Sequence, residues 1–392
     1  MIDRDEVHGI ASRLRRDVLE PIKQRLIGKD EVVEVLGVAL TAGENAFLLG
    51  PPGTGKSALV HELGSRLHGR TFDYLLTRFT EPSELFGPFD LRRLKDGDLV
   101  TNTEGMLPEA DFVFLDELLN ANSAILNSLL LALNERIFRR GRERVSLPML
   151  MAVGASNRLP EDDALAALFD RFLLRVVCDN VDDSRLNEVL IAGWKRESAT
   201  QIDPVLDISD IRKLQQSVVD VDMTNVLPAY CELVHRLRTA GMPLSDRRAV
   251  RLQRVVAASA VTCGRFHADV SDLWIMRYIW DTPAQTETLA AQLSSVQRSY
   301  RSAESPSETE LIQQAVVASS THPMADREKR PDPEHLASLL DEIAAEPQKP
   351  TAPDALMMLG ARIEWVQEDA ARKHLRERVN RLREELTRHH AF

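Results

Sequence analysis

The first half of the chain alternates short apolar runs with segments of helical periodicity. Five apolar runs are bounded by turn or charged residues, and they read ENAFLLG, TFDYLLTR, DFVFLDE, LPMLMAVGASN and FLLRVVCD. Continuous apolar runs of this length are typical of strands buried on both faces of a parallel sheet. Amphipathic stretches such as NSAILNSLLLALNER lie between them. This order predicts an α/β domain with crossover helices over residues 1–183.

The strand-like runs end near residue 183, and the pattern beyond it is helical. DSRLNEVLIAGW, PAYCELVHRLRTAG and SDRRAVRLQRVVAASAVT predict amphipathic helices, so we expect an all-helical second domain over residues 184–300. RSAESPSETE and THPMADREKRPDPEH have the Pro, Ser and charge content of linkers. We therefore expect a separate helical region over residues 301–392. Its last stretch spaces Leu375, Val379, Leu382 and Leu386 along one helical seam.

The composition is that of an ordinary globular protein with an acidic balance. Hydrophobic residues make up 44% of the chain and charged residues 28%, and the formal net charge is −11, which argues against a dedicated nucleic-acid binder. The cysteines, Cys178, Cys231 and Cys263, are far apart in sequence, as buried thiols in a reducing cytoplasm would be. We expect no signal peptide, and no apolar run approaches the about 18 residues of a membrane helix.

The segment FLLGPPGTGKSALV follows a predicted strand and opens a predicted helix, which is the context of a P-loop rather than of an ordinary glycine-rich turn. Its glycines let backbone N–H groups point at phosphates, and the helix N-terminus adds positive dipole. We expect Lys56 to contact the β and γ phosphates of ATP and the Ser57 hydroxyl to bind Mg²⁺. The predicted nucleotide-binding residues of this loop are Gly50, Pro51, Pro52, Gly53, Thr54, Gly55, Lys56, Ser57 and Ala58.

The run FVFLDE ends in two carboxylates, which extend the predicted phosphate site. We expect Asp116 to hold Mg²⁺ through water and Glu117 to orient and polarise the attacking water. An apolar run ending in Asp-Glu is also an ordinary strand end, but the P-loop upstream favours catalysis. Asn157 ends VGASN. It is predicted either to hold the attacking water and sense the γ-phosphate or to serve as a strand-end turn or helix cap.

These motifs carry a family resemblance. GPPGTGKS, FVFLDE, GASN, LFDRF and PLSDRR occur in the order and spacing of Walker A, Walker B, sensor 1, arginine finger and sensor 2, so the chain resembles the AAA+ ATPases, and within them the MoxR group, from about residue 20 to 260. LTRFTEPSELFGPFDLRRLKDGDL and GASNRLPEDDALAALFDRFLLR are similar to the RavA subfamily in particular. RavA proteins carry an extra β-rich domain for which this chain shows no strand pattern, so that subfamily's decarboxylase partner is not expected.

The resemblance implies roles for further residues. Ile27 and Gly28 match the turn that contacts adenine, and Arg171 matches the finger that reaches a neighbouring subunit's nucleotide. Asp170 is then expected to orient Arg171 or to brace the subunit interface, whereas the plain alternative is a local ion pair between the two at a helix end. Sensor 2 matches Arg247, with Arg248 as the alternative register.

Two inserted segments follow from the same resemblance. Residues 80–108 match an insertion in helix 2 that stands near the pore of the ring. NERIFRRGRERVSLP matches a hairpin before sensor 1, whose arginines would approach the channel: Arg139, Arg140, Arg142 and Arg144.

The resemblance implies a cytoplasmic, Mg²⁺-dependent ATPase that forms a homo-oligomeric ring, with a hexamer expected, and remodels a protein client. A partner with a von Willebrand factor A domain is implied as a class. A nucleic-acid motor is the alternative that the arginine-rich hairpin favours and the net charge of −11 disfavours. A slow nucleotide-dependent assembly switch is a third, which the intact Asp116–Glu117 pair disfavours.

Overall fold

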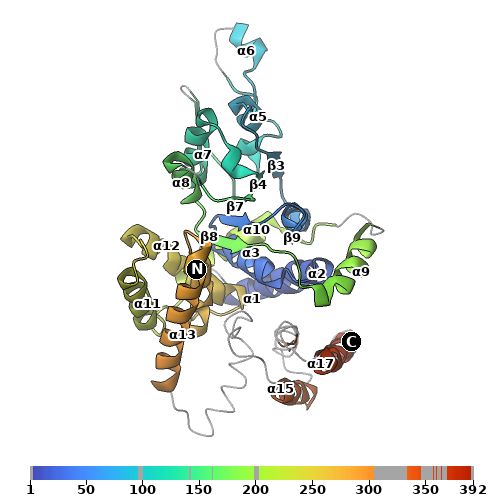
Figure 1. The fold of residues 1–392 in the computed structure, drawn as a ribbon. Helices are drawn as coiled ribbons and strands as arrows, with labels where there is room; N and C mark the ends of the chain where they lie inside the picture. The colour runs from blue at the N-terminus through green and yellow to red at the C-terminus, as the bar shows by residue number, and fades with distance from the viewer. Residues whose placement is uncertain are drawn as a thin grey trace. The chain divides into compact units, whose positions relative to one another are not determined.

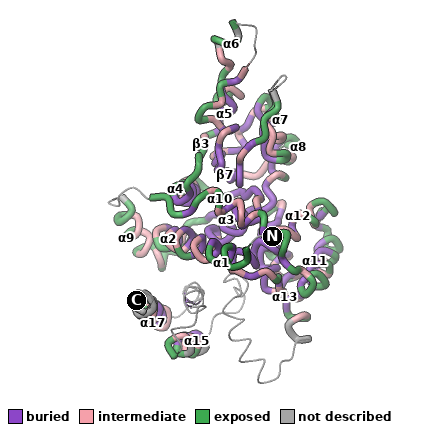
Figure 2. Tube along the Cα trace, turned by 180° about the vertical axis from the view of Figure 1, so that it is seen from behind, coloured by how far each residue is buried: buried purple, intermediate pink, exposed green. Residues whose placement is uncertain are grey.

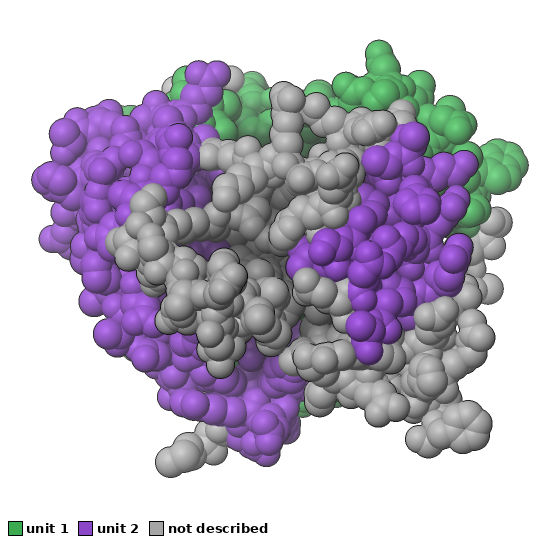
Figure 3. Space-filling model, turned by 90° about the horizontal axis from the view of Figure 1, so that it is seen from below, with its two compact units in different colours: residues 1–2, 13–218, 278–286 green, residues 3–12, 219–277, 287–392 purple. Residues whose placement is uncertain are grey.

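The computed structural model describes residues 3–95, 100–140, 143–160, 162–197, 203–303, 333–345 and 369–389, together with Leu356, Leu359 and Ile363. The chain divides into two compact units, which are coloured separately in Figure 3. Unit 1 comprises residues 1–2, 13–218 and 278–286, and unit 2 comprises residues 3–12, 219–277 and 287–392. Because each unit is assembled from separate stretches, the chain passes between them repeatedly.

Unit 1 is built on a five-stranded parallel sheet with the strand order β3-β4-β7-β1-β8. The strands are β1 (Ala46–Leu49), β3 (Thr71–Leu75), β4 (Phe112–Asp116), β7 (Met151–Ser156) and β8 (Leu174–Val177). Each lies within one of the five apolar runs, so the α/β fold expected from the pattern is confirmed. Figure 2 shows β7 at the buried centre of the sheet, and all its residues are buried.

The register of the central strands brings three chain segments to one edge of the sheet. β7 pairs with β1 through Ala46 and Val153 and with β4 through Phe112 and Met151. Since these three strands are parallel neighbours, the residues that follow each of them meet at the carboxyl edge. The P-loop follows β1, Asp116 ends β4 and Glu117 follows it, and Asn157 follows β7.

Helices cover the sheet on both sides (Figure 1). Those of unit 1 are α2 (Glu20–Arg25), α3 (Asp30–Ala42), α4 (Lys56–Ser65), α5 (Pro82–Phe86), α6 (Leu91–Lys95), α7 (Ser123–Glu135), α8 (Asp163–Phe169), α9 (Leu186–Glu197) and α10 (Ile208–Ser217), with a π-helical turn at Leu14–Leu19. α3 is apolar on nearly all sides and correspondingly buried, and it ends at Gly43 with a left-handed φ of 71°. α7 begins at Asn122, whose side chain accepts hydrogen bonds from two backbone N–H groups of its first turn.

Both segments that were expected to be insertions lie in unit 1, and their assignment as insertions stays a prediction. Residues 80–108 form an arm that contains α5 and α6. α5 begins with a capping box of Glu81 and Glu84, and α6 lies at the outer end of the arm (Figure 1). A bridge between Phe89 and Thr101 closes the arm. The hairpin is formed by β5 (Ile137–Arg140) and β6 (Glu143–Ser146), which pair antiparallel. Arg142 lies outside the described residues, and the channel position of the hairpin stays a prediction.

Unit 2 is helical. Its helices are α1 (Arg4–Arg13), α11 (Leu227–Thr239), α12 (Asp246–Thr262), the 3-10 segment η6 (Val270–Tyr278), α13 (Thr286–Ala303), α15 (Pro333–Ala345) and α17 (Asp369–His389). The helical pattern was expected to mark a new domain from residue 184, whereas the unit boundary falls after Val218. The difference has a physical reason: β9 (Leu206–Asp207) pairs with β2 (Leu67–His68), and α10 packs on α3.

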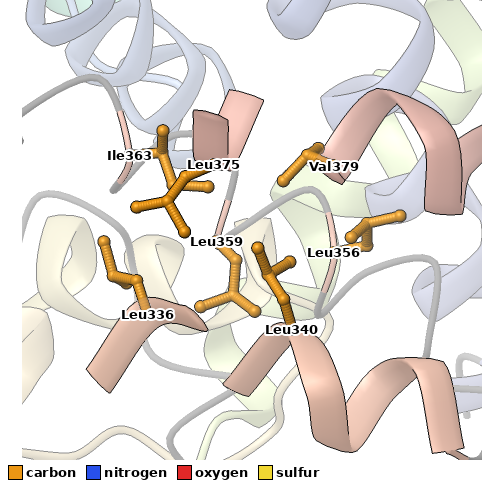
Figure 4. Close-up of a cluster of buried hydrophobic side chains, with 7 residues drawn as sticks. All are labelled: Leu336, Leu340, Leu356, Leu359, Ile363, Leu375 and Val379. Carbon is orange, nitrogen blue, oxygen red and sulfur yellow. The ribbon is translucent and has the colours of Figure 1, made fainter. Parts of the chain in front are cut away.

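The C-terminal helices share an apolar cluster of their own, drawn in Figure 4. The buried members of the cluster are Leu336, Leu340, Leu356, Leu359, Ile363, Leu375 and Val379. Leu375, Val379 and Leu382 of the predicted seam pack here, and the side chain of Leu386 is outside the described set. The expected linkers lie outside the described residues except for their ends, which belong to α13 and α15. None of the helices in the described part of the chain has the length and apolarity that a membrane crossing requires.

Candidate functional site

The P-loop joins β1 to α4 at the carboxyl edge of the sheet. Gly53 and Gly55 have φ values of +82° and +83°, and a Cβ at either position would meet no heavy atom within 4 Å. Glycine adopts this left-handed conformation without steric cost. Gly55 is also the N-cap of α4, so the first N–H groups of that helix are free to face a ligand. An open glycine loop at a helix N-terminus fits the phosphates of a nucleotide. Pro52 is exposed and Ala58 half-buried at its flanks.

The entrance of the P-loop is packed against the end of β8. A Cβ on Gly50 would lie 2.1 Å from the carbonyl oxygen of Cys178, so only glycine fits there. Lys56 Nζ donates hydrogen bonds to the carbonyls of Gly50 and Pro51 at 2.7 and 2.9 Å. Thr54 Oγ1 donates to the same Pro51 carbonyl at 2.9 Å. The lysine ammonium is therefore held over the loop, as a point charge for a phosphate must be.

Ser57 and Asp116 are brought together from α4 and β4. Ser57 Oγ donates a hydrogen bond to Asp116 Oδ2 at 2.9 Å. Both side chains are half-buried at the carboxyl edge of the sheet. Hydroxyl and carboxylate oxygens are the ligands that Mg²⁺ prefers, and Mg²⁺ usually keeps several waters besides. The donor set therefore fits the expected ion.

Glu117 follows β4 in a strained backbone conformation. Its φ and ψ are 50° and 41°, in the left-handed region that non-glycine residues rarely adopt. Its N–H donates to Asp116 Oδ1 at 2.9 Å. Burial raises the pKa of its carboxyl, the charge of Asp116 adds in the same direction, and Lys56 and Arg158 oppose both. Strain of this kind clusters at functional sites, where the surrounding structure imposes it.

Asn157 directly follows β7, the strand between β4 and β1. Its side chain is exposed at the carboxyl edge. The next residue, Arg158, is tied down: its N–H donates to Ser156 Oγ at 3.3 Å, and its Nη2 donates to Asn120 Oδ1 at 2.9 Å. The fold thus brings Asn157 to the same edge as the P-loop and the acidic pair.

The turn at Ile27 and Gly28 lies against the segment after β8. Gly28 has a φ of +73°, and a Cβ there would approach Val181 Cγ2 to 2.9 Å. The neighbouring Lys29 is buried, and its Nζ donates to the carbonyl of Asp179. Burial lowers the pKa of that ammonium. The turn is therefore fixed at the β8 side of the P-loop, while its contact with adenine stays a prediction.

Arg171 lies in the turn between α8 and β8. Its side chain is half-buried, and its Nε is buried without a hydrogen-bond partner among the described residues. Its neighbour Asp170 accepts a hydrogen bond from Arg175 Nη2 at 3.3 Å. The acid therefore pairs with Arg175, and neither the local pair with Arg171 nor an orienting bond to it is formed.

Arg247 lies in unit 2, in the first turn of α12. Ser245 caps this helix by accepting a hydrogen bond from the N–H of Arg248 at 3.2 Å. Arg247 is exposed and Arg248 half-buried. Because the P-loop belongs to unit 1, the sensor 2 assignment and its register stay predictions.

Sequence reasoning did not single out three residues that shape this site: Lys29, Arg158 and Arg175. Each has a side-chain partner that is distant in sequence: the Asp179 carbonyl for Lys29, Asn120 for Arg158 and Asp281 for Arg175. Only Arg175 had a local signal, since it interrupts the apolar run FLLRVVCD and a buried cation requires partners.

Models of two known protein domains match this chain. A family model of the MoxR domain in the MoxR-vWA-beta-propeller ternary systems matches residues 12–216, which is more than half of the 392 residues, and a model of the AAA lid domain matches residues 222–293. The gap between the two matches contains the unit boundary after Val218. Apart from residues 278–286, the lid match thus falls in the helical unit.

Three relatives match half of the chain or more. Two uncharacterised proteins of Methanocaldococcus jannaschii are 34% and 36% identical over 285 and 269 residues, covering 71% and 67% of this chain and 76% and 70% of theirs. Chaperone MoxR1 of Mycobacterium tuberculosis is 27% identical over 217 residues, or 54% of each chain.

A crystal structure from Cytophaga hutchinsonii, provisionally described as an ATPase, has a TM-score of 0.61 and 18% identity and covers 75% of this chain and 96% of that one. At this identity the likeness concerns the fold. The MoxR model matches more than half of this chain, and the P-loop and the acidic pair lie at one edge of the sheet. The chain therefore belongs to the MoxR-type AAA+ ATPases.

Proposed function

We propose that this ATPase hydrolyses ATP in a Mg²⁺-dependent reaction at the edge formed by the P-loop, Asp116, Glu117 and Asn157. The observation that carries the proposal is the hydrogen bond of 2.9 Å between Ser57 and Asp116, because it joins the predicted phosphate loop to the predicted acidic pair. Mg²⁺, when bound, neutralises charge on the phosphates. Lys56 binds the β and γ phosphates, and Ser57 and Asp116 hold the ion.

Glu117 is the residue that we propose acts on the attacking water. As a carboxylate it accepts a proton from that water and orients it toward the γ-phosphate. The left-handed backbone fixes where the side chain leaves the end of β4. Asn157, which follows the neighbouring strand β7, holds the same water through its amide. Glu117→Gln should keep nucleotide affinity and lose turnover.

We further propose that Arg171 acts on the nucleotide of a neighbouring subunit in a ring, with a hexamer expected. Its buried Nε has no hydrogen-bond partner among the described residues. Because a buried donor without an acceptor is unfavourable, we infer that an anion from outside the subunit binds this guanidinium. An arginine in this role raises phosphoryl-transfer rates by about 10³ to 10⁵ in GTPase examples.

The test mixes two inactive variants. Arg171→Ala keeps its water site, and Glu117→Gln keeps its arginine, so a mixed ring should regain ATPase activity. The readout is steady-state phosphate release after demonstrated subunit exchange. A mixture that exchanges subunits and stays inactive would show that Arg171 acts within its own subunit or is structural.

The proposed biological role is cytoplasmic remodelling of a protein client together with a von Willebrand factor A domain partner. The matched model is described for MoxR-vWA-beta-propeller systems, and one relative bears the name of a chaperone. The finer RavA-like assignment rests on the segments 76–99, 105–141 and 154–175. Sensor 2 is assigned to Arg247. Affinity purification of the Glu117→Gln protein with ATP should retain partner and client. Recovery of nucleic acid instead would favour the motor alternative.

A further inference from the structure

Arg175 is a fully buried arginine in the middle of β8. Its side chain is 1% exposed. Its Nε donates to the carbonyl of Phe172 at 3.0 Å, and its Nη2 donates to the carbonyl of Phe169 at 3.4 Å. These two carbonyls flank Asp170 and Arg171 in the chain. The guanidinium therefore closes the turn that carries Arg171 from both sides.

The other side of the same guanidinium binds a segment far away in the sequence. Nη1 donates to the carbonyl of Trp280 at 2.6 Å and also to the carboxylate of Asp281. The segment is itself anchored, since the Asp281 N–H donates to Gln285 Oε1 at 2.7 Å and the Tyr278 hydroxyl donates to Glu31. Arg175 is thus bonded to the Arg171 turn and to this segment at once.

The segment is also the place where the chain leaves one unit and returns to it. Unit 2 ends at Arg277 and resumes at Glu287, and residues 278–286 between them belong to unit 1. Any displacement of the helical unit that moves these two attachment points acts directly on the segment. The bonds of Arg175 join this segment to the turn of Arg171.

Aromatic packing makes this connection stiff. The guanidinium carbon lies 4.1 Å from the centroid of the Phe169 ring. That ring contacts Phe47 edge-on at 4.9 Å and Trp280 at 6.4 Å between centroids. Buried, close-packed groups with discrete arrangements transmit displacement better than exposed ones.

We propose that Arg175 is a positioning residue that fixes the turn presenting Arg171 and connects it to residues 278–286, so that the helical unit sets the position of the arginine offered to the neighbouring subunit. This inference rests on the proposed action of Arg171 between subunits. It concerns geometry rather than contact with nucleotide, because Arg175 is buried in its own subunit.

Removing Arg175 itself would leave several buried carbonyls and Asp281 without their donor, and the protein could fail to fold. Asp281→Asn is the sharper variant, since Asp281 is partly exposed and the amide keeps its size while losing the charge. The bond from Arg175 to the Trp280 carbonyl remains. Glu287→Gln is the matched control: it makes the same charge change nearby, at an exposed residue whose side chain makes no hydrogen bond within the described part of the chain.

The experiment places Asp281→Asn in one of the two subunits of the mixed ring at a time. The reference mixture contains Arg171→Ala and Glu117→Gln subunits only. In the first test mixture, Asp281→Asn is added to the Glu117→Gln subunit, which donates the arginine. In the second, Asp281→Asn is added to the Arg171→Ala subunit, which supplies the water site and has no arginine to position. We expect kcat to fall about tenfold in the first mixture, since small misplacements of a catalytic group are costly. The second mixture should match the reference mixture, and so should either mixture carrying Glu287→Gln.

Each outcome decides the matter. Equal loss in both mixtures, loss only in the second, or no loss in either overturns the inference and leaves the role of Arg171 standing. Changed affinity for a fluorescent ATP analogue in the first mixture also overturns it, because positioning of the arginine predicts a change in kcat alone. If the reference mixture is inactive although subunits exchange, the proposed role of Arg171 fails, and this inference fails with it.

Discussion

Glu117 offers a sharp test of whether the candidate site stores backbone strain. Its φ of 50° lies in the left-handed region, although the residue is not a glycine. That conformation costs a non-glycine residue about 1–2 kcal/mol, and glycine loses about 0.5–1 kcal/mol more backbone entropy on folding. The difference favours glycine by about 1 kcal/mol, or about 2–4 °C in melting temperature for a unit of this size.

The informative comparison is Glu117→Gly against Glu117→Ala. Both variants lack the carboxylate, so their difference isolates the backbone. The carboxylate has an effect of its own: burial and Asp116 raise its pKa in the folded state, so the ionised form is disfavoured there. Glu117→Gln should therefore melt above wild type at pH 7.5. That gain should vanish as the pH falls below the ordinary pKa of glutamate, where the side chain is protonated in both states.

The assay is thermal unfolding without nucleotide at pH 7.5, followed by calorimetry, with phosphate release measured in parallel. Glu117→Gly should melt above Glu117→Ala, and both should be inactive. If Glu117→Gly melts at or below Glu117→Ala, the left-handed backbone is not a source of strain. Retained turnover in Glu117→Ala would refute the assignment of the water-orienting carboxylate.

Three other substitutions and one deletion have defined outcomes. Lys56→Ala should weaken ATP binding about 10- to 100-fold in calorimetric titration, because it removes a charged hydrogen-bond donor, and wild-type affinity would refute the P-loop assignment. Ser57→Ala should abolish the gain in ATP affinity that Mg²⁺ gives the wild type, measured with and without the ion. Gly50→Ala should melt below Gly53→Ala, since its Cβ would lie 2.1 Å from the Cys178 carbonyl oxygen while that of Gly53 meets nothing within 4 Å; the reverse order would contradict the packing. Deleting residues from 305 onward should keep basal ATPase activity within a few-fold, because the tail helices have their own apolar cluster, and a truncated chain that cannot fold would show that the tail is structural.

Features written in contiguous residues could be predicted from the sequence. The five apolar runs predicted the five parallel strands, since burial on both faces of a sheet leaves no polar alternation. GPPGTGKS and FVFLDE predicted that Ser57 and Asp116 would serve one site, because parallel strands deliver their carboxyl ends to one edge. The structure brings those two side chains within 2.9 Å of each other.

The partners of charged residues were decided by the tertiary structure alone. Asp170 and Arg171 are adjacent in sequence, yet Asp170 pairs with Arg175 because the turn after α8 folds back over β8. Arg175 also reaches Asp281, and the hydrogen bond spans 106 residues. The unit boundary differs from the expected one for the same reason. α9 and α10 have the periodicity of any amphipathic helix, and the pairing of β9 with β2 and the packing of α10 on α3 place this segment in the unit with the sheet. Periodicity states which face of a helix is apolar, while the surface that covers that face is a property of the folded chain.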